Sequence, residues 1–437
     1  MSDNGLGFLP KDLPPELSRG HPLLFSFIYG ASYSLFGDNI VVGHIISLII
    51  SIVLLISVYF ICKIQYSKLT GLLSVMLIIA QTIFFAQSVL VLPEICLAVF
   101  IIWSIHFWAI GKYGLYALFS SLAILTKETA VIIPVAIIAA ELLLYISRNK
   151  NSIKFKIKPS QVLIITPFII FGIFLLIQKM QNGWYLFPLH KNNIGFNIQR
   201  LINFSRDFCI FIFYEQGRIV MSGVAAIVLT YSGVRKQFRV NRFSVFLIML
   251  VLGGIIFSAL NFFMNRYLIF VIIPLVILFS AIIIEYSKQF PTVILIIPVI
   301  VICCIYTFNG AYLIGKKDPS LNWEERFDYD ENMQYVDYLS IQKDAVDYVL
   351  NLAGPNDKIF SNFPLVYSFL DTRHGFTEKK IGLDFHIQIT RAHQKGFQFA
   401  LIAEPGSYDY HLPDADSLNV IKVFEGSVAK ITIYTPK

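Results

Sequence analysis

Residues 266–286 read RYLIFVIIPLVILFSAIIIEY, an apolar run whose only charged side chains, Arg266 and Glu285, lie near its two ends. A helix needs about 20 apolar residues to cross the hydrocarbon core of a bilayer. This stretch satisfies that length without interruption. It predicts a membrane-spanning helix.

The composition of the whole chain agrees with lipid as its solvent. Hydrophobic residues make up 56% of the chain and charged residues 14%, whereas about a quarter of an ordinary soluble chain is charged. The formal charge of +7 does not point to nucleic acid, because the Lys and Arg residues sit in short loops between apolar runs. The five cysteines fall in or beside apolar segments, so neither a disulfide framework nor a zinc site is indicated.

Further apolar runs occur along most of the chain and predict a polytopic α-helical membrane protein with about 10–11 transmembrane helices. The expected spans are 22–37, 39–62, 69–91, 93–110, 113–126, 128–147, 160–180, 208–230, 243–263, 266–286 and 290–309.

Lys and Arg in alternate loops predict the orientation, because cytoplasmic loops carry an excess of both. One set of loops is basic and contains Lys63, Lys68, Lys112, Arg148 and Arg242. The opposite face is therefore expected to be external, which is the periplasmic side of a bacterial inner membrane. An N-terminal segment at 1–21 and a long loop at about 181–207 are expected on that face.

The tail has a different composition, with frequent charges and short apolar runs. We expect a transmembrane domain over 22–309 and a small external α/β domain over 310–437. Helical spacing marks Leu339 to Ala353, and strand patterns occur at 358–361, 397–403, 420–424 and 428–434.

Polar residues that lipid should exclude gather on the predicted external face, where they are candidates for function. Glu94 follows Pro93 at a helix start, Lys127 and Glu128 form a turn, and Arg266 with Tyr267 opens a late span. Other candidates on this face are Asp12, Arg19, His21, Trp184 and His190.

Four motifs resemble the GT-C membrane glycosyltransferases in content and order. They are RGHPLLFSFIYGASYSLFG at 19–37, SVLVLPEICLAVF at 88–100, AILTKETAVIIP at 123–134 and NRYLIFVIIPLVIL at 265–278. The resemblance is to family 39, the dolichyl-phosphate-mannose protein mannosyltransferases and the bacterial aminoarabinose transferases of lipid A. It implies inverting transfer of a sugar from a polyprenyl-phosphate donor to an acceptor hydroxyl.

The resemblance also implies roles for single residues. Arg266 and Tyr267 match a pair that meets the carrier phosphate, and Lys127 would be a second phosphate partner. Glu94 stands where relatives usually have Asp, so it would take part in catalysis, orienting the acceptor or holding a divalent cation such as Mg, Mn or Zn. His21 matches a His-Pro signature and would line the cavity, with Arg19, Trp184 and His190.

One feature departs from the family. Its main catalytic Asp lies in a loop between a first span and the His-Pro motif, but only Asp3 and Asp12 precede His21 here. Asp12 is the candidate that the chain offers. The basic loops also place Met1 outside without an apparent signal peptide, so we expect the natural chain to start upstream.

Simpler interpretations stand beside the catalytic ones. Glu94 could merely stabilise a helix N-terminus, and Lys127 and Arg266 could be interfacial side chains that extend toward water. Glu215 and Arg218 are expected to form a structural ion pair at a helix end. For the whole chain, the alternatives are a transporter or flippase of a lipid-linked precursor, or a non-catalytic remnant that binds the carrier lipid.

Overall fold

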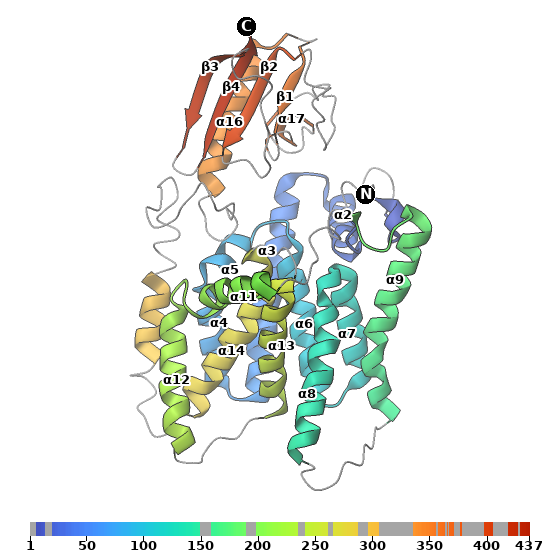
Figure 1. Cartoon of the computed structure of the whole chain (residues 1–437), viewed down its shortest axis with the longest axis vertical. Coiled ribbons are helices and arrows are strands. Elements are labelled where there is room, and N and C mark those ends of the chain that lie inside the picture. The colour runs from blue at the N-terminus through green and yellow to red at the C-terminus, as the bar shows by residue number, and fades with distance from the viewer. Residues whose placement is uncertain are drawn as a thin grey trace. The chain divides into compact units, whose positions relative to one another are not determined.

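Figure 1 shows the chain as a computed structural model. The structure describes residues 6–13, 20–148, 159–188, 198–234, 241–260, 265–286, 296–305, 335–354, 357–362, 365, 367–370, 376–377, 397–404, 418–426 and 429–437. Two compact units are present, one formed by Met1–Gly37 with Val42–Thr307 and the other by Asp38–Val41 with Phe308–Lys437.

The first unit consists of helices. They are η1 (Pro10–Asp12), α2 (Leu24–Phe36), α3 (Ile40–Gln65), α4 (Lys68–Ile79), α5 (Thr82–Gln87), α6 (Pro93–Ala109), α7 (Tyr113–Thr126), η2 (Glu128–Val131), α8 (Ile132–Arg148), η3 (Pro159–Ile165), α9 (Thr166–Asn182), α11 (Ile198–Phe213), α12 (Arg218–Val234), α13 (Arg242–Leu260), η4 (Asn265–Leu268) and α14 (Ile269–Glu285). A further short apolar helix covers Ile296–Ile305.

Each of the eleven expected spans has an apolar helical counterpart. Among the described residues, five helices are long and apolar enough to cross a membrane, or six if one bent pair is counted as a span. Five shorter apolar helices of 10–17 residues lie at the other expected positions, so the structure supports five or six of the expected spans by length and composition. The protein is therefore a multi-pass α-helical membrane protein.

Two expected spans are broken. The run at 69–91 divides into α4 and α5 at Gln81, whose backbone is extended (φ −77°, ψ 123°). The run at 208–230 divides into α11 and α12, which meet at 85°. Gln216 and Gly217 have positive φ at this break. Because α11 already begins at Ile198, it occupies the end of the loop that the sequence predicted at 181–207.

Helix α14, which contains the opening stretch, lies at the centre of the helical unit. Some 89% of the apolar window in Arg266–Glu285 is buried, against 17% in Pro159–Asn182. Helices α4, α6, α12 and α13 pack against α14. Gly254 on α13 allows α13 and α14 to approach each other closely, because a Cβ at this position would lie 2.5 Å from Val271 Cγ2 on α14. A surrounded helix such as α14 can fix the position of the residues at its N-terminus.

The second unit contains a four-stranded sheet and helix α16 (Tyr335–Leu352), with a short helix α17 (Tyr367–Leu370). The strands are β1 (Ile359–Ser361), β2 (Phe399–Glu404), β3 (Leu418–Glu425) and β4 (Lys430–Pro436), in the order β1-β2-β4-β3. β1 and β2 are parallel, and the other pairs are antiparallel. Val346 and Val349 of α16 share an apolar core with Ile431 and Ile433 of β4. The predicted helix and all four predicted strands are confirmed.

Candidate functional site

A buried ion pair joins the start of helix α6 to the end of the neighbouring helix α7. Lys127 Nζ donates to Glu94 Oε1 at 2.8 Å, and the two side chains are 5% and 2% exposed. Glu94 lies in the first turn of α6, behind Pro93. Lys127 follows the last residue of α7, and its extended backbone (φ −158°, ψ 131°) turns the chain toward η2. Charges this deeply buried are retained only when they are paired.

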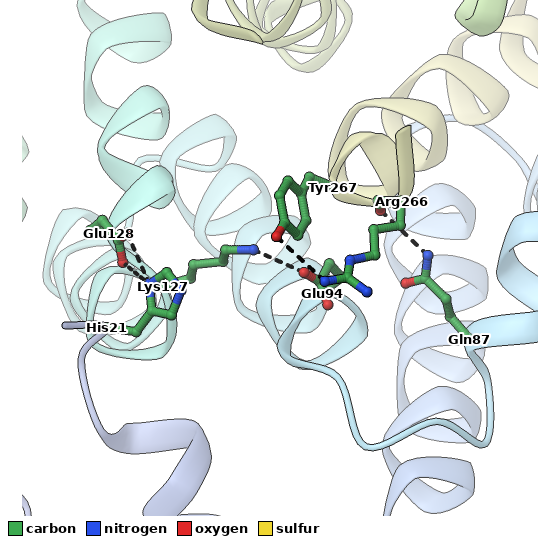
Figure 2. A network of polar contacts seen from close by, with 7 residues as sticks. All are labelled: His21, Gln87, Glu94, Lys127, Glu128, Arg266 and Tyr267. Carbon is green, nitrogen blue, oxygen red and sulfur yellow. Dashed lines mark hydrogen bonds and ion pairs between the residues drawn. The ribbon is translucent and has the colours of Figure 1, made fainter. Parts of the chain in front are cut away.

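Arg266 and Tyr267 complete this cluster from the start of α14. The ring centroid of Tyr267 lies 3.6 Å from Lys127 Nζ and 5.1 Å from the Arg266 guanidinium carbon. The phenol oxygen is 3.4 Å from an Arg266 terminal nitrogen, which donates to it. Lys127 and Arg266 both attract the Glu94 carboxylate electrostatically. Figure 2 shows the four side chains converging. The polar residues that the sequence singled out near 94, 127 and 266 therefore form one cluster.

Gln87 is a member of the site that the sequence did not predict. It ends α5 with 1% exposure, and its Nε2 donates to the Arg266 carbonyl oxygen at 3.4 Å (Figure 2). Its Oε1 has no hydrogen-bond partner among the described residues, and neither does Glu94 Oε2. An amide near the end of an apolar segment is the available signal, but the sequence places Gln87 within the span expected at 69–91.

A second polar pair lies on the other side of the α7–η2 turn. His21 Nδ1 is 2.9 Å from Glu128 Oε1 and 2.8 Å from Oε2. These side chains are 30% and 18% exposed, so they are more open than Glu94 and Lys127. The cavity-lining role predicted for His21 stays a prediction, but its partner is now defined.

The remaining candidates lie elsewhere or outside the described residues. Asp12 Oδ2 accepts a hydrogen bond from the Leu9 backbone at 2.7 Å, within the turn of η1. Trp184 stacks edge-on with Phe187 and borders Gly20, the residue before His21. Arg19 and His190 lie outside the described residues. The catalytic role of Asp12 stays a prediction.

The residues around Glu94 do not fit a divalent cation. One carboxylate oxygen already accepts from Lys127, and Arg266 adds a second positive charge. A metal ion would be repelled by both. Throughout the described part of the chain, no three His, Cys, Asp or Glu side chains come together as a metal site. The divalent cation rests on the family resemblance alone, and the charges around Glu94 do not support it there.

The comparisons with known proteins agree with this arrangement of helices. A family model described as dolichyl-phosphate-mannose-protein mannosyltransferase matches residues 20–177. Comparison with curated protein sequences finds no match. Among solved structures, ArnT from Cupriavidus metallidurans bound to undecaprenyl phosphate superposes with a TM-score of 0.57. That alignment has 10% identity and covers 95% of this chain and 88% of ArnT. The chain shares the fold of this ArnT.

The apo form of the same ArnT gives a TM-score of 0.56 at 11% identity, covering 98% of this chain and 88% of ArnT. The family resemblance is confirmed over residues 20–177, which hold the motifs at 88–100 and 123–134 and nearly all of that at 19–37. The likeness in fold extends over the C-terminal unit. At these identities the fold of ArnT is shared, while individual side chains need not be. The chemistry of Glu94, Lys127 and Arg266 must be argued from their own geometry.

Proposed function

We propose that the protein transfers a sugar from a polyprenyl-phosphate donor to an acceptor hydroxyl by inverting displacement, with Lys127 and Arg266 binding the carrier phosphate. The observation that carries this is the convergence of two cations on one tyrosine ring beside a single buried carboxylate. The cluster therefore has a net positive charge where the helices end. The likeness in fold to an ArnT whose structure contains bound undecaprenyl phosphate supports the choice of ligand.

Each cation has hydrogen-bonding capacity suited to a phosphate. An ammonium group carries three donors. One Lys127 donor is used by Glu94 Oε1, and the Tyr267 ring covers another face. A guanidinium stays charged and can bind phosphate oxygens in a bidentate manner. Two cations at the departing phosphate would stabilise the negative charge that develops when the glycosidic bond breaks.

Glu94 would then act mainly by holding the cations. Its carboxylate is 2% exposed and is already engaged by Lys127. A paired, buried carboxylate is a weak base, so removal of a proton from the acceptor fits it less well than orientation of Lys127. Gln87 would position Arg266 through its backbone carbonyl.

The orientation of the site in the membrane is also part of the proposal. Helix α6 starts at the cluster and ends before Lys112, and α8 runs from the cluster to Arg148. Helix α13 starts at Arg242 and leads toward η4, which contains Arg266. The described basic loop residues thus lie at the helix ends opposite Glu94 and Lys127. This supports a cluster on the external, periplasmic side of a bacterial inner membrane.

The test measures carrier binding and sugar transfer separately. Arg266→Ala is expected to weaken binding of undecaprenyl phosphate in nanodiscs, and to lower transfer from the polyprenyl-phosphate sugar by about 100-fold. Lys68→Ala is the matched control, since it removes an exposed cation from the start of α4, at the opposite helix ends. Unchanged carrier binding in Arg266→Ala would contradict the phosphate site. Normal binding by the wild type without any transfer would favour a carrier-binding or flippase function.

A further inference from the structure

The pair of His21 and Glu128 lies outside the phosphate cluster and has no role in the function proposed above. A carboxylate only accepts hydrogen bonds, so the contacts of 2.8 and 2.9 Å require His21 Nδ1 to be the donor. In the neutral imidazole the proton is then on Nδ1 and the basic lone pair is on Nε2. A carboxylate that orients an imidazole in this way also stabilises the imidazolium ion that forms when Nε2 takes up a proton.

The backbone of His21 is held in place by elements distant in sequence. Gly20 has φ +70°, and a Cβ there would lie 2.8 Å from Phe187 Cβ and 3.0 Å from Trp184. Gln178 Nε2 on α9 donates to the Gly20 carbonyl oxygen at 3.2 Å. Glu128 fixes the ring itself from the start of η2. A side chain held by its backbone and its ring is preorganised for a task in catalysis.

Exposure distinguishes the two polar pairs. The Glu94 and Lys127 side chains are almost completely buried, but the His21 side chain is 30% exposed. A group that exchanges a proton with a bound hydroxyl must be within hydrogen-bond reach of it. Of these two pairs, His21 with Glu128 is the one that an acceptor can reach.

The two pairs also point away from each other. Lys127 and Glu128 are consecutive, yet Lys127 extends toward Glu94 and Glu128 toward His21 (Figure 2). The proposed phosphate ligand and the imidazole with its carboxylate partner are therefore separate groups that meet at one turn.

We propose that His21, oriented by Glu128, accepts the proton of the acceptor hydroxyl. This role rests on the proposed function. The hydroxyl oxygen forms a bond to the anomeric carbon, and the bond from that carbon to the phosphate oxygen breaks. Its electron pair stays on the polyprenyl phosphate beside Lys127 and Arg266. The hydroxyl proton moves to His21 Nε2, and the resulting imidazolium later returns it to water.

The decisive variant is His21→Gln, whose amide can still donate to Glu128 but cannot accept the proton. We expect kcat for transfer to fall about 100-fold, with KM for the lipid donor and the binding of undecaprenyl phosphate little changed. Glu128→Gln should lower kcat in the same direction. His106→Gln is the matched control, because His106 pairs with Gln65 near the opposite end of α6.

The pH profile supplies a readout that a purely structural role would not move. In the wild type, kcat should decline toward acid pH, because protonated His21 cannot accept a proton, and this limb should vanish in His21→Gln. Among the described residues, the surrounding elements carry further titratable side chains. These are Glu128 and Lys127 at the turn, Lys179 on α9, Lys11 and Asp12 on η1, Tyr29 and Tyr33 on α2, Tyr113 and Tyr116 on α7, and Glu141 and Tyr145 on α8. Their contributions should persist in the variant.

Three outcomes would overturn the proposal. An unchanged kcat in His21→Gln would show that the imidazole accepts no proton. A large rise in KM with weaker carrier binding would make His21 a phosphate ligand instead. A lower unfolding midpoint with normal kcat for the folded fraction would make the pair a structural tie. Failure of the wild type to bind undecaprenyl phosphate would instead overturn the proposed function itself, which separates the two failures.

Discussion

Replacing Lys127 with methionine is expected to lower the free energy of unfolding by about 3–5 kcal/mol, because it leaves the Glu94 carboxylate buried without its ion-pair partner. Carrier binding should be lost as well. The double variant Lys127→Met with Glu94→Leu should recover most of the stability, since it removes both charges and keeps similar side-chain volumes. It should not recover binding. The midpoint of thermal unfolding in detergent and the binding of undecaprenyl phosphate measure the two effects.

The second unit offers a matched control for this pair. Lys430 Nζ lies 2.7 Å from Glu404 Oε2, but these side chains are 43% and 48% exposed. An exposed pair of this kind contributes about 0.2–1 kcal/mol, so Lys430→Met should barely move the midpoint. If Lys127→Met were equally mild, the pair would not be buried as described. If the double variant bound the carrier normally, Lys127 would not be a phosphate ligand.

The membrane-spanning helices could be predicted from the sequence because their signal is local. A run such as 266–286 must be helical in lipid, where every backbone donor and acceptor has to be satisfied within the segment. The last two strands of the sheet were predictable for a related reason. Glu425 and Gly426 separate two runs in which apolar and polar residues alternate. Both predictions needed only the order of apolar and polar residues within one segment.

The helix breaks could not be predicted in the same way. The polar run from Glu215 to Arg218 interrupts the hydropathy of the expected span at 208–230, but it does not record the direction that the backbone takes there. The 85° turn depends on positive φ at Gln216 and Gly217. Gln81 likewise interrupts an apolar run with one amide, and its effect depends on a partner more than a hundred residues away.

The sequence predicted which residues belong to the candidate site better than it predicted their contacts with one another. Glu94, Lys127 and Arg266 were recognisable as polar residues at the ends of apolar segments, and the family resemblance gave two of them a common ligand. The sequence could not show that Lys127 bonds to Glu94, or that His21 meets Glu128 across 107 positions. Such contacts depend on which helices pack together. Gln87 was missed because its significance lies in a contact with the Arg266 backbone.

Replacing Arg218 with leucine is expected to cost about 3–5 kcal/mol of stability, the scale for removing one partner of a buried charged network. The side chain is fully buried at the α11–α12 break. Its Nε donates to the carbonyl oxygen of Ile212 at 2.8 Å, and the guanidinium also donates to that of Phe211. These carbonyls lie at the end of a helix that stops, so they lack partners within it. Leucine would leave them buried and unsatisfied.

The same guanidinium links the two broken spans, because it donates to Gln81 Oε1 at 2.8 Å. Arg218→Leu and Gln81→Leu should therefore be non-additive in unfolding midpoint, whereas independent sites would add. Arg206→Leu is the control, since Arg206 is 68% exposed and pairs with neighbouring Asp207. Gln81 directly precedes α5, and Gln87 ends this helix against the Arg266 backbone, so Arg218→Leu should also weaken carrier binding. Full stability in Arg218→Leu, or strict additivity with Gln81→Leu, would show that the bend is maintained by the surrounding helices.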